Sequence, residues 1–287
     1  MPTTELDRPA DLNRRDFVRA AVGTGFASAV LPVTAQTIKT DSTGLTVGEV
    51  TIMVGDFKRP AYRAMPAGKT SLPVVLVVSE IFGVHEHIAD VARRFAKLGY
   101  LAIAPELFVR QGDAQSYGEI AKLVAEVVGK VPDAQVMGDL DACVAWAKGN
   151  GGDTSKLAIT GFCWGGRITW LYTAHNPGVK AGVAWYGQLL GTPSALKPIN
   201  PIDLVGKLNA PVLGLYGGED TGIPVAAVDQ MKAALAGGNA AAKASQFVVY
   251  PGAPHAFHAD YRPSYKKDAA EDGWKRCTAW FKANGVS

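Results

Sequence analysis

The chain has 287 residues, and its 29 Lys and Arg and 26 Asp and Glu give a formal net charge of +3. The charges are spread out, without a run of basic residues or interleaved basic and aromatic residues, which argues against a nucleic-acid-binding protein. Three cysteines without paired Cys-x-x-Cys or His-Glu-x-x-His spacing argue against a disulfide framework and a metal site. Because the sequence has no Gly-x-Gly-x-x-Gly or Walker-type loop, we expect no cofactor.

The N-terminal stretch resembles a bacterial export signal. Arg14 and Arg15 stand in the sequence Asn-Arg-Arg-Asp-Phe-Val-Arg, and a weakly apolar stretch rich in Ala and Gly follows at 20–33. Small residues end this stretch at Ala35, as expected before a signal-peptidase site. The stretch is shorter than the roughly 20 residues that span a bilayer, so we expect no stable membrane anchor. We predict a twin-arginine signal peptide at 1–35, handling by the twin-arginine export machinery, and a periplasmic or secreted protein; a disordered basic tail is the alternative.

Beyond the predicted signal, the chain has the length of one domain. A polar, Thr-rich linker is predicted at 36–48 and a catalytic domain at 49–287. Strand-like apolar runs alternate with helical periodicity, which predicts an α/β fold with a mostly parallel central sheet and helices on both faces. We expect an antiparallel pair at 47–54 and 59–65, strands at 73–78, 100–104, 156–160 and 182–186, strands opening the segments 210–220 and 246–255, and helices at 88–98, 119–128, 134–148, 224–236 and 271–283.

A glycine-rich turn between a strand and a helix carries a candidate nucleophile. The sequence Gly-Phe-Cys-Trp-Gly at 161–165 follows the strand at 156–160 and leads into a helix. Its glycines permit a sharp turn, and the Gly-x-Ser-x-Gly version is the nucleophile elbow of α/β-hydrolases. A thiol at a helix start is favoured as the reactive thiolate. We predict Cys163 as the nucleophile and the N–H of Trp164 as an oxyanion donor, against the alternative of a turn with an incidental core cysteine.

A cysteine nucleophile needs a base, and the base needs a carboxylate that orients it. In α/β-hydrolases the order along the chain is nucleophile, acid, histidine. Two strands downstream of the cysteine open into loops, one with Glu219 and Asp220 and the next with His255 and His258. Loops past the carboxyl ends of strands are where open α/β sheets keep their sites. We predict Asp220 as the acid and His255 as the base, while Glu219, His258 and a turn-capping role for Asp220 stay open.

The loop after the first long strand also bears on the reaction. The strand at 73–78 is followed by Ser-Glu-Ile-Phe-Gly-Val-His. In α/β-hydrolases this loop supplies the second oxyanion N–H, for which Ile81 is our candidate. Glu80 would then lie beside the nucleophile, where a carboxylate can accept the thiol proton. The alternative for Glu80 is a solvated strand end or an ion pair with Arg110 or Arg167.

Four short motifs occur together along the chain. They are Glu-Ile-Phe-Gly-Val at 80–84, Pro-Glu-Leu-Phe-Val-Arg at 105–110, Gly-Phe-Cys-Trp-Gly-Gly at 161–166, and Gly-Glu-Asp at 218–220 with Pro-His-Ala-Phe at 254–257. In combination they resemble the dienelactone hydrolase family, also called carboxymethylenebutenolidases. The resemblance implies a cofactor-free hydrolase of carboxylic esters or lactones with Cys163, His255 and Asp220 as its triad. It further implies that Glu80 changes partners with the thiol when substrate binds, and that Arg110 helps to hold a substrate carboxylate.

One position departs from the family pattern. Dienelactone-cleaving members carry a second carboxylate-binding arginine four residues after the catalytic histidine, where this chain has Ala259. Arg262 and His258 lie nearby without the matching spacing. Because alanine cannot make a charge-assisted contact with a carboxylate, we expect less dependence on an acidic substrate.

Two other function classes stay open from the sequence. A thioesterase or other acyl hydrolase acting on a cell-envelope compound would need the same nucleophile, acid and base. A non-catalytic binding protein could keep the fold without turnover, since fold does not fix function. The presence of nucleophile, acid, base and both oxyanion positions favours an enzyme.

Overall fold

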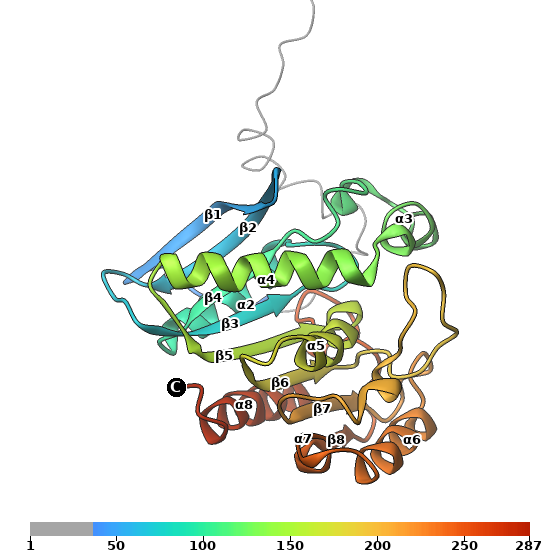
Figure 1. Ribbon diagram of the computed structural model, residues 1–287. Coiled ribbons are helices and arrows are strands. Elements are labelled where there is room, and N and C mark those ends of the chain that lie inside the picture. Colours follow the sequence, from blue (N-terminus) through green and yellow to red (C-terminus); the bar gives the residue numbers. More distant parts are fainter. Residues whose placement is uncertain (1–36) are drawn as a thin grey trace, which may run out of the picture.

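Eight strands form a single sheet in this computed structural model, which describes residues 37–287. The order across the sheet is β1-β2-β4-β3-β5-β6-β7-β8 (Figure 1). β1 pairs antiparallel with β2, and β2 pairs antiparallel with β4. Every neighbouring pair from β4 across the sheet to β8 is parallel. The strands are β1 (Leu45–Val54), β2 (Phe57–Pro66), β3 (Leu72–Val78), β4 (Leu101–Pro105), β5 (Gly152–Phe162), β6 (Val179–Trp185), β7 (Val212–Gly217) and β8 (Gln246–Tyr250).

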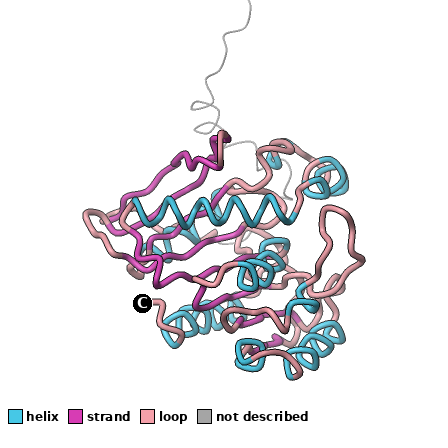
Figure 2. The backbone as a smooth tube through the Cα atoms, in the orientation of Figure 1, coloured by secondary structure: helices cyan, strands magenta, loops and turns pink. Residues whose placement is uncertain are grey.

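Helices cover both faces of this sheet, as Figures 1 and 2 show. Side chains of α4, α5 and α6 pack on one face, and those of α2 and α8 pack on the other. The predicted α/β-hydrolase fold is confirmed. The helices are α2 (Glu86–Lys97), α3 (Ile120–Glu126), α4 (Asp133–Gly149), α5 (Trp164–His175), α6 (Val225–Ala236), α7 (Ala240–Ala244) and α8 (Lys267–Ala283).

The central strand β3 shows why the sheet needs two helical layers. Val74 and Leu76 lie in the core that contains α4 and α5, whereas Val75 and Val77 lie in the core that contains α2 and α8. Successive side chains of a strand point to opposite faces, so an uninterrupted apolar run buries both. The apolar run in the sequence therefore determined a strand with helices on each side.

The segment predicted as a linker contacts the domain from Thr40 onward. β1 already begins at Leu45, which pairs with Pro66 of β2. Before the strand, the N–H of Thr40 donates to Asp90 Oδ1 of α2 at 2.5 Å. Strand pairing and a carboxylate on α2 thus hold part of a stretch whose composition alone is polar.

Two helices differ in length from their predicted bounds. α3 covers Ile120–Glu126 and passes into a 3₁₀ turn at Val128–Lys130, where one helix at 119–128 was expected. α8 begins at Lys267 rather than at 271, since its first turn is polar and carries no apolar periodicity. Between residues 37 and 287, no helix is both long enough and apolar enough to cross a bilayer. The predicted signal peptide at 1–35 lies outside the described residues.

Candidate active site

The predicted nucleophile occupies a sharp turn between β5 and α5. Cys163 has φ of 54° and ψ of −112°, a conformation that costs a residue with a side chain of order 1–3 kcal/mol. Its N–H donates to the carbonyl of Trp185 at 3.0 Å, which ties the turn to the end of β6. The thiol is half-buried rather than enclosed. A strained strand–helix turn that presents a nucleophile is the geometry of the α/β-hydrolase elbow.

The glycines around this turn are required by close backbone contacts. A Cβ on Gly161 would lie 2.1 Å from the carbonyl oxygen of Gly165, and a Cβ on Gly165 would lie 2.3 Å from that of Val78. Neither position can hold a side chain unless the backbone moves. The elbow is thus packed directly against the carboxyl end of β3, where the loop with the predicted second oxyanion donor begins.

The predicted acid and base are hydrogen-bonded to each other. His255 Nδ1 lies 2.7 Å from Asp220 Oδ2, and the carboxyl group is buried. The other carboxylate oxygen accepts from the N–H groups of Gly222 and Ile223, at 2.9 and 3.0 Å. Asp220 therefore caps its turn and orients a histidine at the same time. Of the two acids that the sequence left open, Asp220 rather than Glu219 is the partner of His255.

His255 is held in a setting that favours its charged form. Burial alone lowers its pKa, but the hydrogen bonds with Asp220 and Cys163 and their charges outweigh burial and raise the pKa to about 10. The ring edge of Tyr186 packs against the imidazole, with the ring centroids 5.1 Å apart. The arrangement brings Cys163, His255 and Asp220 together.

His258, the other histidine of this loop, is a core residue. It is buried against Trp185 and Phe162, with ring centroids 4.5 and 5.0 Å away. Burial, together with the charges of His87 and Arg94, holds its pKa well below the usual range. A buried neutral imidazole packed against aromatic rings is a core residue, and no hydrogen bond joins it to a carboxylate among the described residues. The structure therefore favours His255 over His258 as the base.

Glu80 lies at the end of β3, next to the elbow. Val78 pairs with Gly161 in parallel register, so Glu80 and Cys163 each lie two residues past a paired position. The carboxylate is buried, and its Oε2 is 3.0 Å from His85 Nε2 while its Oε1 accepts from Tyr261 at 3.4 Å. Burial raises the pKa of Glu80, but the hydrogen bond and charge of His85 more than offset this, so that the pKa falls below its usual range. The carboxyl is thus an ionised group whose partners are His85 and Tyr261.

The two predicted oxyanion donors belong to segments that meet at the elbow. Trp164 is the first residue of α5, so its N–H is one of those without an acceptor inside the helix. Ile81 comes two residues after Ser79, whose carbonyl oxygen would lie 2.6 Å from a Cβ on Gly165. The loop that carries Ile81 therefore runs across the start of α5.

Arg110 is engaged with a buried carboxylate. Its Nη1 lies 2.8 and 3.0 Å from the two oxygens of Asp139, which also forms an ion pair with buried Arg59. The guanidinium stacks over the ring of Phe57 at 4.2 Å. A substrate carboxylate would have to share Arg110 with Asp139.

Ala259 and Arg262 have different surroundings. Ala259 is fully buried in the core on the α2 and α8 face, so a longer side chain there would meet packed residues. Arg262 is half-buried, with its guanidinium 5.7 Å from the ring centroid of Phe82. Its charge acts on Glu80, which places it near the elbow. Arg262, and not His258, is the cation of this loop that lies beside the site.

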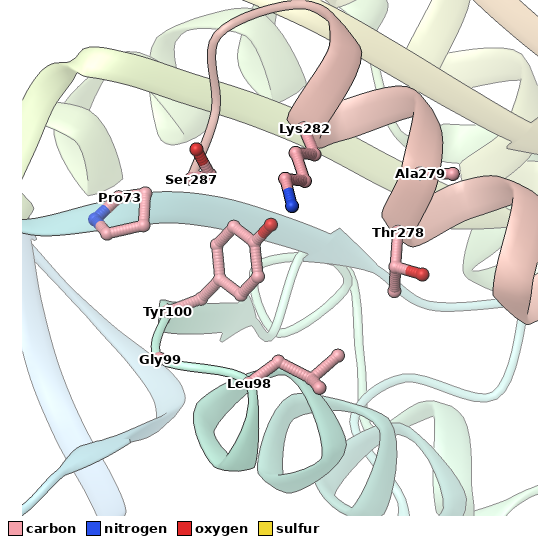
Figure 3. Close-up of a pocket in the computed structure, with 8 residues that line it drawn as sticks. All are labelled: Pro73, Leu98, Gly99, Tyr100, Thr278, Ala279, Lys282 and Ser287. Atoms are coloured by element: carbon pink, nitrogen blue, oxygen red, sulfur yellow. The ribbon is translucent and has the colours of Figure 1, made fainter.

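Sequence reasoning missed His85 and Tyr261, the partners of Glu80. Both lie within segments that carry predicted site residues, but neither stands at a motif position, and only the meeting of β3, α2 and the His255 loop brings them to Glu80. In the part of the chain that the structure describes, no group of three or more His, Cys, Asp or Glu is arranged to hold a metal ion. The pocket in Figure 3 is about 530 Å³ and lies between the amino ends of β3 and β4 and helix α8, at the edge of the sheet opposite Cys163.

Comparison with known proteins adds to this geometry. The profile described as "Dienelactone hydrolase family" matches residues 60–285. The chain belongs to the dienelactone hydrolase family. It is 63% identical over 278 residues to a Methylorubrum extorquens protein named "Putative carboxymethylenebutenolidase", covering 96% of this chain and 94% of that protein. A protein of the same name from Escherichia coli K12 is 53% identical over 262 residues, covering 91% of this chain and 96% of the relative.

A solved structure agrees with the family assignment. A crystal structure from Klebsiella pneumoniae, titled as that of a "Putative Dienelactone Hydrolase", superposes with a TM-score of 0.81 at 55% identity, covering 83% of this chain and 98% of that one. Dienelactone hydrolases have the α/β-hydrolase fold, and the observed sheet and helical layers agree with it. The chain is accordingly a hydrolase of the dienelactone hydrolase type, an enzyme acting on ester or lactone bonds.

Proposed function

We propose that this enzyme hydrolyses carboxylic esters or lactones through a triad of Cys163, His255 and Asp220. The observation that carries the proposal is the 2.7 Å contact between His255 Nδ1 and buried Asp220, with Cys163 at a positive-φ elbow within reach of the same imidazole. Nucleophile, base and orienting acid in this mutual arrangement are the parts of covalent acyl-transfer catalysis.

Acylation uses the thiolate and the imidazolium. Cys163 Sγ attacks the carbonyl carbon, and the carbonyl electrons move onto the oxygen. The N–H groups of Trp164 and Ile81 stabilise this oxyanion, and each such donor is worth roughly 10²–10³ in rate. As the carbon–oxygen bond to the leaving group breaks, His255 gives that oxygen its proton. The product is a thioester between the acyl group and Cys163.

Deacylation reverses the roles of the same residues. Neutral His255 takes a proton from water while the water oxygen attacks the thioester carbonyl. Collapse of the second tetrahedral intermediate breaks the carbon–sulfur bond, so the acid is released and the thiolate returns. Asp220 stabilises the imidazolium that forms in this step, and its two backbone N–H contacts keep it in place.

Glu80 is proposed to accept the proton of the Cys163 thiol before acylation. Its carboxylate lies beside the elbow, and an ionised carboxylate can accept the thiol proton. In the structure both of its oxygens face His85 and Tyr261. Substrate binding would therefore have to be accompanied by a change of partner at Glu80.

We expect this enzyme to depend less on a free carboxylate in its substrate than dienelactone-cleaving members of the family do. Ala259 is buried in the core and Arg110 is shared with Asp139, so neither offers an unshared cation to an acid. Arg262 remains as one half-buried cation beside the site. Neutral esters should then compete well with acidic lactones. No observation favours the alternative of an envelope thioesterase or that of a non-catalytic binding protein.

An activity panel tests the proposed reaction. Neutral aryl esters, small lactones and a carboxylated dienelactone would be assayed for kcat/KM with the wild type, Cys163→Ala and Cys143→Ala. Cys143 is fully buried in α4 and serves as the matched thiol control. Turnover that depends on Cys163 and not on Cys143 supports the proposal. Ester or lactone hydrolysis that persists in folded Cys163→Ala would overturn it.

We also propose that residues 1–35 direct export through the twin-arginine machinery to the periplasm or beyond, with cleavage after Ala35. The paired arginines, the apolar stretch and the small residues at its end support this. Changing Arg14 and Arg15 together to Lys should leave uncut precursor in the cytoplasm, as followed by fractionation and mass spectrometry of the N-terminus. Undiminished export of the double variant would refute the signal assignment.

A further inference from the structure

We propose that His85 is a positioning residue of this enzyme and holds Glu80 as a carboxylate beside Cys163. Glu80 and His85 then form a second carboxylate–imidazole couple, in addition to Asp220 and His255, and Glu80 accepts the thiol proton. The inference rests on the proposed reaction. The effect of His85 on Glu80 can nevertheless be measured without ester turnover.

The first step concerns the free energy that is needed to bury an ionised Glu80. Both side chains of the Glu80–His85 pair are almost completely buried, and their closest atoms are 3.0 Å apart. A carboxylate without a partner in such a place would bind a proton, because burial disfavours the charged form. An ionised carboxylate only accepts hydrogen bonds, so His85 Nε2 carries the proton that it shares with Glu80. His85 is therefore what allows a charged Glu80 to exist there.

The second step concerns where Glu80 lies relative to the elbow. The register of β3 and β5 places both residues just past the ends of neighbouring parallel strands. Two buried tyrosines report the same proximity, since the pKa values of Tyr186 and Tyr261 are each raised chiefly by burial and also by the charges of both Glu80 and Cys163. Glu80 and Cys163 thus both lie near the same two tyrosines, at the carboxyl ends of β3 and β5.

The third step is to separate His85 from the other groups around Glu80. His87 joins His85 from the start of α2, Tyr261 and Arg262 come from the loop after the catalytic histidine, and Tyr186 and Cys163 follow β6 and β5. Among the causes that lower the pKa of Glu80, the hydrogen bond and charge of His85 exceed the charges of His87 and Arg262. Removal of His85 should therefore affect Glu80 more than removal of any other single neighbour.

His85 is itself held in place. It precedes α2, its N–H donates to the carbonyl of Gly83 at 3.1 Å, and its ring packs edge-on against Tyr261 with a centroid distance of 4.9 Å. The ring of His87 stacks beside it at 6.1 Å. A fixed imidazole fixes the direction of the carboxylate that it binds.

The proton transfer that this couple would serve is balanced. The Sγ–H bond of Cys163 breaks, its electron pair stays on sulfur, and the proton binds a carboxylate oxygen of Glu80. When the thiolate is released after deacylation, Glu80 returns the proton to sulfur. His85 takes no part in bond making; it keeps Glu80 unprotonated until the thiol proton arrives.

The test replaces His85 by Leu, which cannot hydrogen-bond, and by Gln, whose amide can still donate. His175→Gln is the matched control, because His175 forms an exposed couple with Asp141 at 2.7 Å near the opposite end of α5. The pH profile of kcat/KM would be measured for a neutral aryl ester. In parallel, infrared spectroscopy would follow protonation of Glu80, with Glu80→Gln used to assign its band.

If His85 keeps Glu80 ionised, His85→Leu should move the acidic limb of the profile upward by about one pH unit or more, a tenfold change in the Glu80 proton equilibrium. The plateau above that limb should be retained, His85→Gln should lie between Leu and the wild type, and His175→Gln should match the wild type. The Glu80 infrared titration should shift in the same order. The plateau and the Gln variant separate this effect from damage to the fold.

A loss of activity that is equal at every pH, or an unshifted Glu80 titration in both folded variants, would overturn the proposal. The infrared titration and the rate of Cys163 alkylation by iodoacetamide do not require ester turnover. A protein that fails to hydrolyse esters but shows the shifted Glu80 titration would contradict the proposed reaction and leave the role of His85 supported.

Discussion

Two carboxylate–histidine couples flank the elbow cysteine, and they differ in exposure. The Asp220–His255 contact is 2.7 Å and the Glu80–His85 contact is 3.0 Å, so the bonds themselves are similar. The side chain of His255 is 35% exposed, whereas that of His85 is 2% exposed. An imidazole must reach the leaving group and water to act as acid and base. The imidazole of His255 is therefore open to solvent and substrate, whereas that of His85 is enclosed and can act only through Glu80.

The couples are also built differently. Asp220 follows β7 and His255 follows β8, so two strand ends converge on one hydrogen bond. Glu80 and His85 lie five residues apart in a single loop, between β3 and α2. A third couple, Asp141 with His175, lies on the surface near the far end of α5. Position in the fold, and not the presence of a carboxylate beside a histidine, gives each couple its chemistry.

The largest expected effect comes from replacing Cys163, the proposed nucleophile. Cys163→Ala should lower kcat for ester hydrolysis on the order of 10⁴-fold or more, since it removes the proposed nucleophile. Cys143→Ala should stay near wild type. Single-turnover assays with mass spectrometry would detect the acyl adduct on the wild type alone. An adduct on another residue would contradict the assignment.

The next effect is on the accessible couple. Asp220→Asn should keep the fold but reduce kcat on the order of 10³–10⁴-fold with little change in KM, because the amide fails to stabilise the imidazolium. Asp141→Asn, in the exposed couple, is the control and should leave kcat unchanged. Steady-state kinetics and thermal melts of both variants provide the check. Equal losses in the two variants would mean that Asp220 acts through folding.

A third carboxyl shows what burial does without a histidine. Glu106 accepts from the N–H of Val84 at 2.5 Å, and burial raises its pKa from 4.5 to about 7. The folded state thus holds a proton between pH 4.5 and about 7 that the unfolded state has lost, so this carboxyl makes stability fall as the pH rises through that window. Glu106→Gln should remove the loss and stabilise the protein by about 3 kcal/mol at pH 8, with little effect near pH 4.5.

Urea unfolding at several pH values measures the Glu106 effect. Glu119→Gln is the control, since Glu119 is exposed and pairs with Lys122 on the surface. The difference between the Glu106 variant and the wild type should grow with pH, and the control should show no such trend. A pH-independent difference would show that Glu106 is already ionised in the folded protein at neutral pH.

The smallest expected effect concerns substrate charge beside the buried couple. Arg262→Ala should lower kcat/KM for a carboxylated lactone about fivefold relative to a neutral ester, since a half-buried cation contributes about 1 kcal/mol to such a contact. Arg276→Ala, which removes an exposed ion pair with Asp272, is the matched control. An unchanged ratio would mean that another group, with Arg110 the first to test, binds the acid.

Much of the fold and the centre of the site follow from local sequence. The apolar run of β3 requires burial on both faces, and the glycines at 161 and 165 permit an elbow that no other residue fits, so the sequence alone identifies Cys163 as the candidate nucleophile. Loops after strands located Asp220 and His255 because parallel strands bring their carboxyl ends to one edge. These features depend on backbone geometry, which short stretches of sequence encode.

Tertiary structure alone decided which partners the remaining side chains have. His258 and His255 differ by three positions, yet only packing against Trp185 and Phe162 makes the first a core residue. Arg110 is matched as a family residue by its motif, but Asp139 on α4 engages it, and Glu80 takes His85 as its partner. Burial and pairing depend on groups that meet only when the sheet forms, so composition and spacing determined the elbow, and the three-dimensional neighbours determined how each charge around it behaves.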